Sequence, residues 1–107
     1  MAKEKLKDIV YKADSLIHGT GLFAKRKIKK GEYIGIYEGK QARRNGTYVL
    51  WVYEDEGAEP VGRSGKNLLR YLNHSVPGNA EFDGFDLYAR VKIKLDDEIT
   101  FDYKEFD

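Results

Sequence analysis

Arg70-Tyr71-Leu72-Asn73-His74-Ser75 is the most informative stretch of this chain, and Asn79 follows it closely. Its Asn, His and Ser side chains bring hydrogen-bond donors and acceptors to one turn, although a polar cap after a short helix would look similar. A second stretch, Glu98-Ile99-Thr100-Phe101-Asp102-Tyr103, lies further along the chain. Two polar segments of this kind are hard to explain by packing alone. Together they predict a functional site.

Composition sets the class of protein. The 107 residues are enough for one domain, and the 13% aromatic content, with eight Tyr and five Phe, favours strands and a lined pocket over a helical bundle. The chain has no cysteine, which excludes disulfides and thiolate metal sites, and its two histidines show no ligand-like spacing, so no metal is expected. The chain shows no secretory leader and no apolar run of membrane-spanning length. We therefore expect a cytoplasmic protein that does not bind membranes, with a host-cell or nuclear location left open.

Charge is unevenly distributed along the chain. Residues 1–31 hold nine Lys/Arg and three Asp/Glu (+6), residues 32–79 six of each (0), and residues 80–107 four and nine (−5). The acidic last third favours a basic partner. The lysines of the first third are interpreted as a solvated face, because the overall pI of about 7.9 is low for a dedicated nucleic-acid binder. Direct binding of nucleic acid is therefore not expected.

Strand signals dominate the local patterns, and no long amphipathic helix is present. Residues 67–72 have apolar spacing suited to one or two helical turns, and two polar, glycine-containing stretches, residues 41–46 and 54–65, are expected as loops. The sequence predicts a mostly β protein with short strands over residues 9–11, 22–24, 33–37, 47–53, 87–91 and 98–103.

A glycine motif lies near the start of the chain, in His18-Gly19-Thr20-Gly21-Leu22-Phe23-Ala24. By itself it is explained by a hairpin turn. A dinucleotide-binding site would need a third glycine that opens a helix, but Ala24 occupies that position and a basic turn follows. Glycines would nevertheless let the main chain approach a ligand closely.

Four segments, taken in order, resemble the SET domain of protein lysine methyltransferases. They are the G-x-G-x-x-A pattern at residues 19–24, the strand at residues 31–39, the stretch 70–79, which is similar to R-F-I-N-H-S-C-x-P-N, and residues 98–103, which are similar to E-E-L-T-F-D-Y. The match departs from the pattern at Val76, in place of Cys, and at Pro77-Gly78. The expected form is the minimal microbial and viral type, without cysteine-rich segments before and after the domain.

The resemblance implies a fold and a domain plan. The expected fold is mostly β, with several short curved sheets, one or two helical turns and a C-terminal pseudoknot in which the last strand passes through a loop. The single domain would span residues 1–107, with a core at approximately 8–103 and an insert at approximately 39–66.

The resemblance also implies an activity: S-adenosylmethionine-dependent N-methylation of a lysine in a basic protein, histone or histone-like. Tyr103 takes the position of the active-site tyrosine. Phe101 takes a position that influences how many methyl groups are added, and its lack of a hydroxyl predicts di- or trimethylation. The substrate channel would include Tyr48, Phe101 and Phe82. The expected cofactor-binding residues are His18, Gly19, Thr20, Gly21, Arg70, Asn73 and His74.

Other readings of the chain stay open. Without a cysteine-rich segment after Tyr103, the substrate or a second copy in a homodimer would have to complete the lysine channel. The domain could instead be a catalytically idle SET-like module that binds a peptide or nucleic acid. A third class is a small nucleic-acid-binding barrel that stacks bases on Tyr48, Trp51 and Tyr53, although the acidic residues 54–56 would repel phosphate beside those rings.

Overall fold

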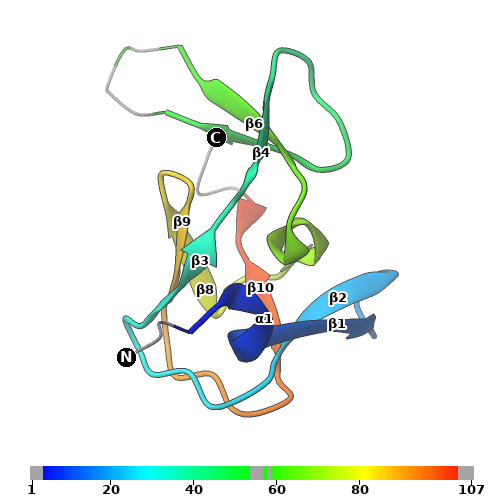
Figure 1. Cartoon of the computed structure of the whole chain (residues 1–107), viewed down its shortest axis with the longest axis vertical. Helices are drawn as coiled ribbons and strands as arrows, with labels where there is room; N and C mark the ends of the chain where they lie inside the picture. Colours follow the sequence, from blue (N-terminus) through cyan, green and yellow to red (C-terminus); the bar gives the residue numbers. More distant parts are fainter. Residues whose placement is uncertain (1–3, 54–56, 58, 104–107) are drawn as a thin grey trace.

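The computed structural model describes residues 4–53, 57 and 59–103 (Figure 1). Short strands dominate it, with one turn of α-helix and one of 3-10 helix. In chain order the elements are α1 Leu6–Ile9, β1 Val10–Asp14, β2 Thr20–Ala24, β3 Tyr33–Ile36, β4 Gly39–Ala42, β5 Val49–Val52, β6 Val61–Gly65, η1 Leu68–Tyr71, β7 Asn73–His74, β8 Ala80–Asp83, β9 Asp86–Ala89 and β10 Glu98–Phe101. The expectation of a mostly β fold with short helical turns is confirmed.

The strands form two sheets. The larger has the order β1-β2-β10-β8-β9-β3, with β7 also paired to β10, and the smaller has the order β4-β6-β5. The smaller sheet lies at one end of the molecule, above η1 and β10 in Figure 1. Residues 39–66, expected as an insert, contain all three of its strands. The order shows that β10 occupies the middle of the larger sheet although it comes last among the described strands.

The last strand passes beneath a loop of the chain. Phe101 of β10 pairs in parallel with His74 of β7 and with Ala80 of β8. The connection between β7 and β8, residues 75–79, must therefore cross over β10. Gly78 lies at this crossing, where an added Cβ would be 2.5 Å from Cα of Phe101 and 2.8 Å from the Asp102 nitrogen. The contact is backbone against backbone, and only glycine permits it.

Side chains of Asn79 and of the core hold the crossing in place. The Asn79 amide donates to the Glu98 carbonyl oxygen at 2.8 Å, and its Oδ1 accepts from the Thr100 nitrogen at 2.9 Å. It thus replaces strand pairing where the loop leaves the sheet. Leu22, Leu69 and Ile99 are fully buried. They belong to a core formed by residues of the β1–β2 hairpin, the β8–β9 hairpin and η1.

Two expected loops contain strands. Residues 41–46 begin within β4, and residues 54–65 end in β6, the central strand of the smaller sheet. Low strand propensity is overridden by pairing on both sides of β6. Gly62 contributes directly, because a Cβ there would lie 2.7 Å from the Trp51 ring on the neighbouring strand. The sequence interpretation also missed α1 and β8, which are short and have no strong periodicity.

Candidate functional site

Asn73 connects β7 to the glycine turn. Its amide nitrogen lies 3.0 Å from the carbonyl oxygen of His18 and 2.9 Å from Oε2 of Glu98. The Ser15 hydroxyl is 2.8 Å and 2.9 Å from the two Glu98 carboxylate oxygens, and it accepts from the Ile17 nitrogen. Ser15, Glu98 and Asn73 therefore form a polar cluster that fixes the shape of the turn.

The glycine turn itself faces solvent. His18, Gly19 and Thr20 are exposed, and Gly19 adopts a positive φ of 44° with open space where a Cβ would be. Gly21 differs, because a Cβ there would collide with Oε2 of Glu98. Three of the residues predicted to bind the cofactor thus form one exposed backbone turn, Gly21 is buried at its end, and Asn73 holds the turn through hydrogen bonds.

Tyr103 is attached to β7 and to the residue directly before it. Its backbone nitrogen donates to Nδ1 of His74 at 3.0 Å, and its hydroxyl donates to the Leu72 carbonyl oxygen at 3.1 Å. The His74 and Tyr103 rings lie 4.8 Å apart. An Asp102 oxygen is 3.9 Å from the same His74 nitrogen. The two segments that led the sequence interpretation therefore meet in space.

A cavity of about 230 Å³ opens beside Tyr103. Phe101 lines it, and its ring centroid is 4.7 Å from that of Tyr103. The walls are mostly aromatic and aliphatic, so the cavity can exclude water from the stem of a long side chain. Its lining residues are Tyr37, Thr47, Tyr48, Val49, Leu50, Trp51, Leu69, Arg70, Leu72, Phe101 and Tyr103.

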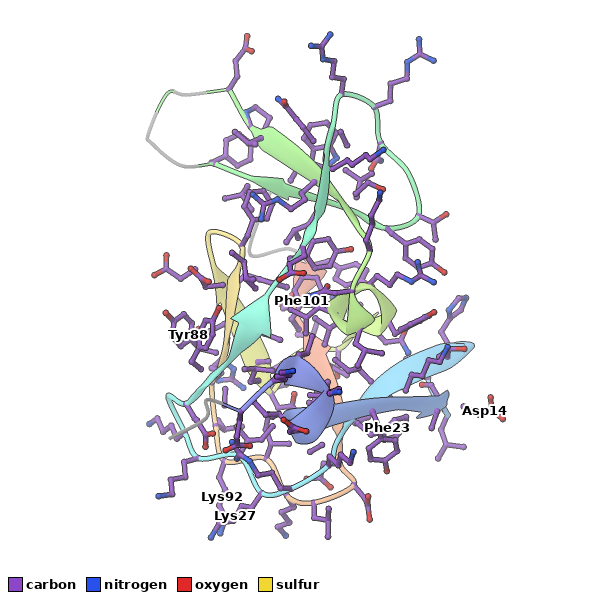
Figure 2. The ribbon with its side chains drawn as sticks, in the orientation of Figure 1. Asp14, Phe23, Lys27, Tyr88, Lys92 and Phe101 are labelled. Carbon is purple, nitrogen blue, oxygen red and sulfur yellow. The ribbon has the colours of Figure 1, made fainter. Side chains whose placement is uncertain are left out.

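The residues predicted for the substrate channel separate into two positions. Tyr48 and Phe101 line the cavity. Phe82 does not: it is 9% exposed and packs edge-on against Phe101, with ring centroids 5.0 Å apart, so it supports the wall from behind. Figure 2 shows Phe101 between the central strands and the smaller sheet.

Arg70 lies in η1 and lines the cavity. Its guanidinium is 5.1 Å from the Tyr48 ring centroid and donates to the Tyr71 hydroxyl at 2.8 Å. Stacking and hydrogen bonding hold the guanidinium in place. The structure thus places a fixed cation at the cavity rim.

Tyr37 is a cavity residue that the sequence interpretation treated as scaffold. Its hydroxyl donates to the Tyr48 carbonyl oxygen, which joins the residue after β3 to the residue before β5. Burial raises the pKa of Tyr37 to about 12, and burial also raises the pKa of Tyr103. Both phenols therefore keep their protons at neutral pH and act as hydrogen-bond donors rather than bases. A tyrosine ending an otherwise apolar strand was the available signal.

The raised pKa of Tyr37 predicts loss of stability at alkaline pH. An unfolded tyrosine ionises near pH 10, so the contribution of the neutral phenol is complete below about pH 10 and is lost as the pH rises towards about 12. We expect the free energy of unfolding, from chemical denaturation, to fall across this range. Tyr37→Phe should show a shallower fall. The remainder comes from the other tyrosines whose pKa is raised, among them Tyr33, to about 12 by burial and Asp86, and Tyr103, by burial. An unchanged slope in Tyr37→Phe would contradict this assignment.

Residues 4–53, 57 and 59–103 contain no group of three His, Cys, Asp or Glu side chains placed to hold a metal ion. Over the same residues, no helix has the length and apolar character needed to cross a membrane.

Comparison with known proteins agrees with this geometry. Residues 19–104 match the family model of the SET domain. The chain belongs to the SET-domain family. The match includes the glycine turn, the β7 segment and Tyr103, so the recognition made from four short segments is confirmed.

Several curated relatives are similar to this SET domain. It is 32% identical to the histone-lysine N-methyltransferase trr of Drosophila melanogaster, over 95% of this chain and 5% of that protein. It is 29% identical to an H3 lysine-4 specific histone-lysine N-methyltransferase of Emericella nidulans, over 94% and 10%. It is 27% identical to the histone-lysine N-methyltransferase trithorax of Drosophila virilis, over 95% and 3%. The chain thus spans a tenth or less of the length of these relatives.

Proposed function

We propose that this SET domain is an S-adenosylmethionine-dependent protein-lysine N-methyltransferase. The position of Tyr103 carries the proposal: it lines an aromatic cavity, and its hydroxyl is fixed by the Leu72 carbonyl oxygen, next to the strand that supports the glycine turn. Family membership and the names of the relatives support lysine as the acceptor.

The residues around the turn fit S-adenosylmethionine. The exposed backbone of residues 18–20 offers main-chain groups, and Gly19 leaves open space for close approach. The half-buried His74 lies on the neighbouring strand, while Arg70 offers a cation at the cavity rim to a carboxylate. The cofactor would supply a methyl group already activated by its sulfonium. No metal is needed for such a transfer.

The chain's own contribution is to present an uncharged lysine nitrogen. A free lysine has a pKa near 10.4, so roughly a thousandth is neutral at pH 7.4. A cavity lined by Tyr37, Tyr48 and Trp51 disfavours the ammonium form and excludes water. The Tyr103 hydroxyl donates to the Leu72 carbonyl oxygen, so its own oxygen remains able to accept from an amine N–H and fix the direction of the lysine nitrogen. Positioning is the main source of rate in this arrangement.

Two measurements test the activity. Calorimetric titration with S-adenosylmethionine should show binding, and incubation with radiolabelled cofactor and histone proteins, followed by mass spectrometry, should show methylated lysines. Binding without transfer would favour the alternative of a catalytically idle peptide-binding module. Absence of both would reject the proposed function.

Phe101 should set the number of methyl groups. It is 7% exposed and lines the cavity without a polar atom, so we propose that di- and trimethyl-lysine fit beside it. Phe101→Tyr places a hydroxyl there that can hold water and crowd the amine, and the product should shift towards monomethyl-lysine in mass spectra. The matched change Phe23→Tyr, on β2 and stacked on Tyr11, should leave the product ratio unchanged. An unchanged ratio in Phe101→Tyr would remove its proposed role.

The substrate class follows from charge and from the relatives. We propose a basic, histone-like protein, because Glu81, Asp83 and Asp86 make the β8–β9 hairpin acidic.

We also propose that a second copy of the chain covers the open side of the cavity in a homodimer. Light scattering after gel filtration would test it.

A further inference from the structure

A shallow basic groove runs beside the proposed active site. It has a volume of about 430 Å³ and is formed by α1, β1 and the start of η1, which lie together near the centre of Figure 1. Five cationic side chains line it, and no carboxylate does. The lining residues are Lys5, Leu6, Lys7, Lys12, Lys66, Asn67, Leu68, Arg70 and Tyr71.

The positive charge of the groove is not neutralised locally. Among the described residues, none of its five cations forms an ion pair with a carboxylate. Glu4 and Glu32, which line the neighbouring hollow, are already engaged by Arg26. Asp8 of α1 directly follows Lys7 in the chain, and its carboxylate accepts from the Lys5 backbone nitrogen. The groove therefore presents a net positive field to solvent.

Tyr71, which lines the groove, lies next to two of its cations. Arg70 donates to the Tyr71 hydroxyl, and the Lys12 amine is 5.2 Å from the ring centroid. The hydrogen bond from Arg70 is the main reason why the pKa of Tyr71 is lowered. The Arg70 guanidinium is also 4.9 Å from the Tyr71 ring centroid, so this ring is already engaged by two cations. The groove would therefore recognise a ligand by its negative charge.

We infer that this groove binds the phosphate backbone of duplex DNA. Spaced lysines that neutralise phosphates account for most sequence-independent binding, and a duplex keeps its own bases stacked inside. A single strand would need exposed aromatic platforms, which the groove lacks. The sequence interpretation treated the lysines of the first third as a solvated face. Because Lys5, Lys7 and Lys12 gather in one groove, we now assign them a binding role.

The groove explains how a basic substrate could approach a basic surface. Arg70 belongs both to the groove and to the cavity rim, so the two sites adjoin. Free histone-like protein would be repelled by the groove, whereas the same protein bound to DNA brings the polyanion that the groove attracts. This recruitment rests on the proposed function, but DNA binding itself does not.

Fluorescence anisotropy with a labelled 20-base-pair duplex, titrated with the full chain without cofactor, tests the inference. Lys12→Gln/Lys66→Gln should weaken binding about tenfold at low salt and reduce the slope of log K against log salt by about two. The matched control is Lys27→Gln/Lys92→Gln, which removes the same charge from exposed lysines outside the groove. Figure 2 shows this pair at the opposite end of the molecule from the smaller sheet. The control should bind as the parent does.

Three outcomes would overturn the inference. Equal losses in the two double variants would mean that net charge alone governs binding. Tighter binding of a single-stranded oligonucleotide would reject a duplex ligand. Binding of polyglutamate with the same dependence on Lys12 and Lys66 would point to an acidic protein partner instead. The experiment measures DNA binding and not turnover. Its result therefore does not depend on whether the chain transfers methyl groups.

Discussion

Tyr103→Phe should reduce methyl transfer about 100-fold or more, because loss of the hydroxyl leaves the lysine amine without its fixed partner in the cavity. Only the bond to the Leu72 carbonyl oxygen is removed from the fold. A hydrogen bond of this kind contributes about 1 kcal/mol, so the variant should remain folded. Single-turnover assays, with circular dichroism as the check on folding, measure both quantities.

Tyr88→Phe is the matched control for this change. Tyr88 lies on β9, packs against Tyr33 with ring centroids 5.3 Å apart, and does not line the cavity. Figure 2 shows it on the outer side of β9. Its loss of a hydroxyl should leave turnover near the parent value. If Tyr103→Phe also retained near-parental turnover, the assigned role of Tyr103 would be wrong.

Gly78→Ala should destabilise the protein by about 3 kcal/mol, because the added methyl group meets backbone that cannot move aside. The clash is with Cα of Phe101 at 2.5 Å and with the Asp102 nitrogen. Relief requires separating the residue 75–79 loop from β10, which would also displace Tyr103. Urea denaturation should show a lower midpoint, and methyl transfer should fall with it.

Gly46→Ala provides the comparison. A Cβ there would be 3.4 Å from a Val49 methyl group, and the backbone has no positive φ. We expect a change in stability within about 0.5 kcal/mol. A similar small change in Gly78→Ala would show that the loop can lift away from the strand at little cost.

Sequence alone gave the mostly β class, the helical turn near Leu68 and the meeting of His74 with Tyr103. These depend on local propensity and on motifs whose order along the chain is readable. Sequence did not predict β6, because its glycines have low strand propensity. Gly62 is nevertheless suited to this strand, since the Trp51 ring packs where a side chain would be. Tertiary pairing decided that strand.

The cavity was only partly predictable for a related reason. Tyr48 and Phe101 were identified because they lie in conspicuous aromatic or motif segments. Tyr37 was missed, and Phe82 was assigned to the channel although it packs behind Phe101. Which face of an aromatic ring meets a cavity depends on how two sheets are oriented, and no pattern within one strand contains that information. Whether the residues predicted to bind cofactor do so remains a prediction.

The crossing of residues 75–79 over β10 has a consequence for the kinetics of folding. The β1–β2 and β8–β9 hairpins are local and can close early, but β10 must join strands made from residues as distant as Phe23 and Ala80. Contacts of such high sequence separation form slowly. Insertion of this strand would therefore be the late step, and the same step brings Tyr103 to His74. Recovery of methyl transfer during refolding should then coincide with the slowest phase, leaving no partly folded species that is already active.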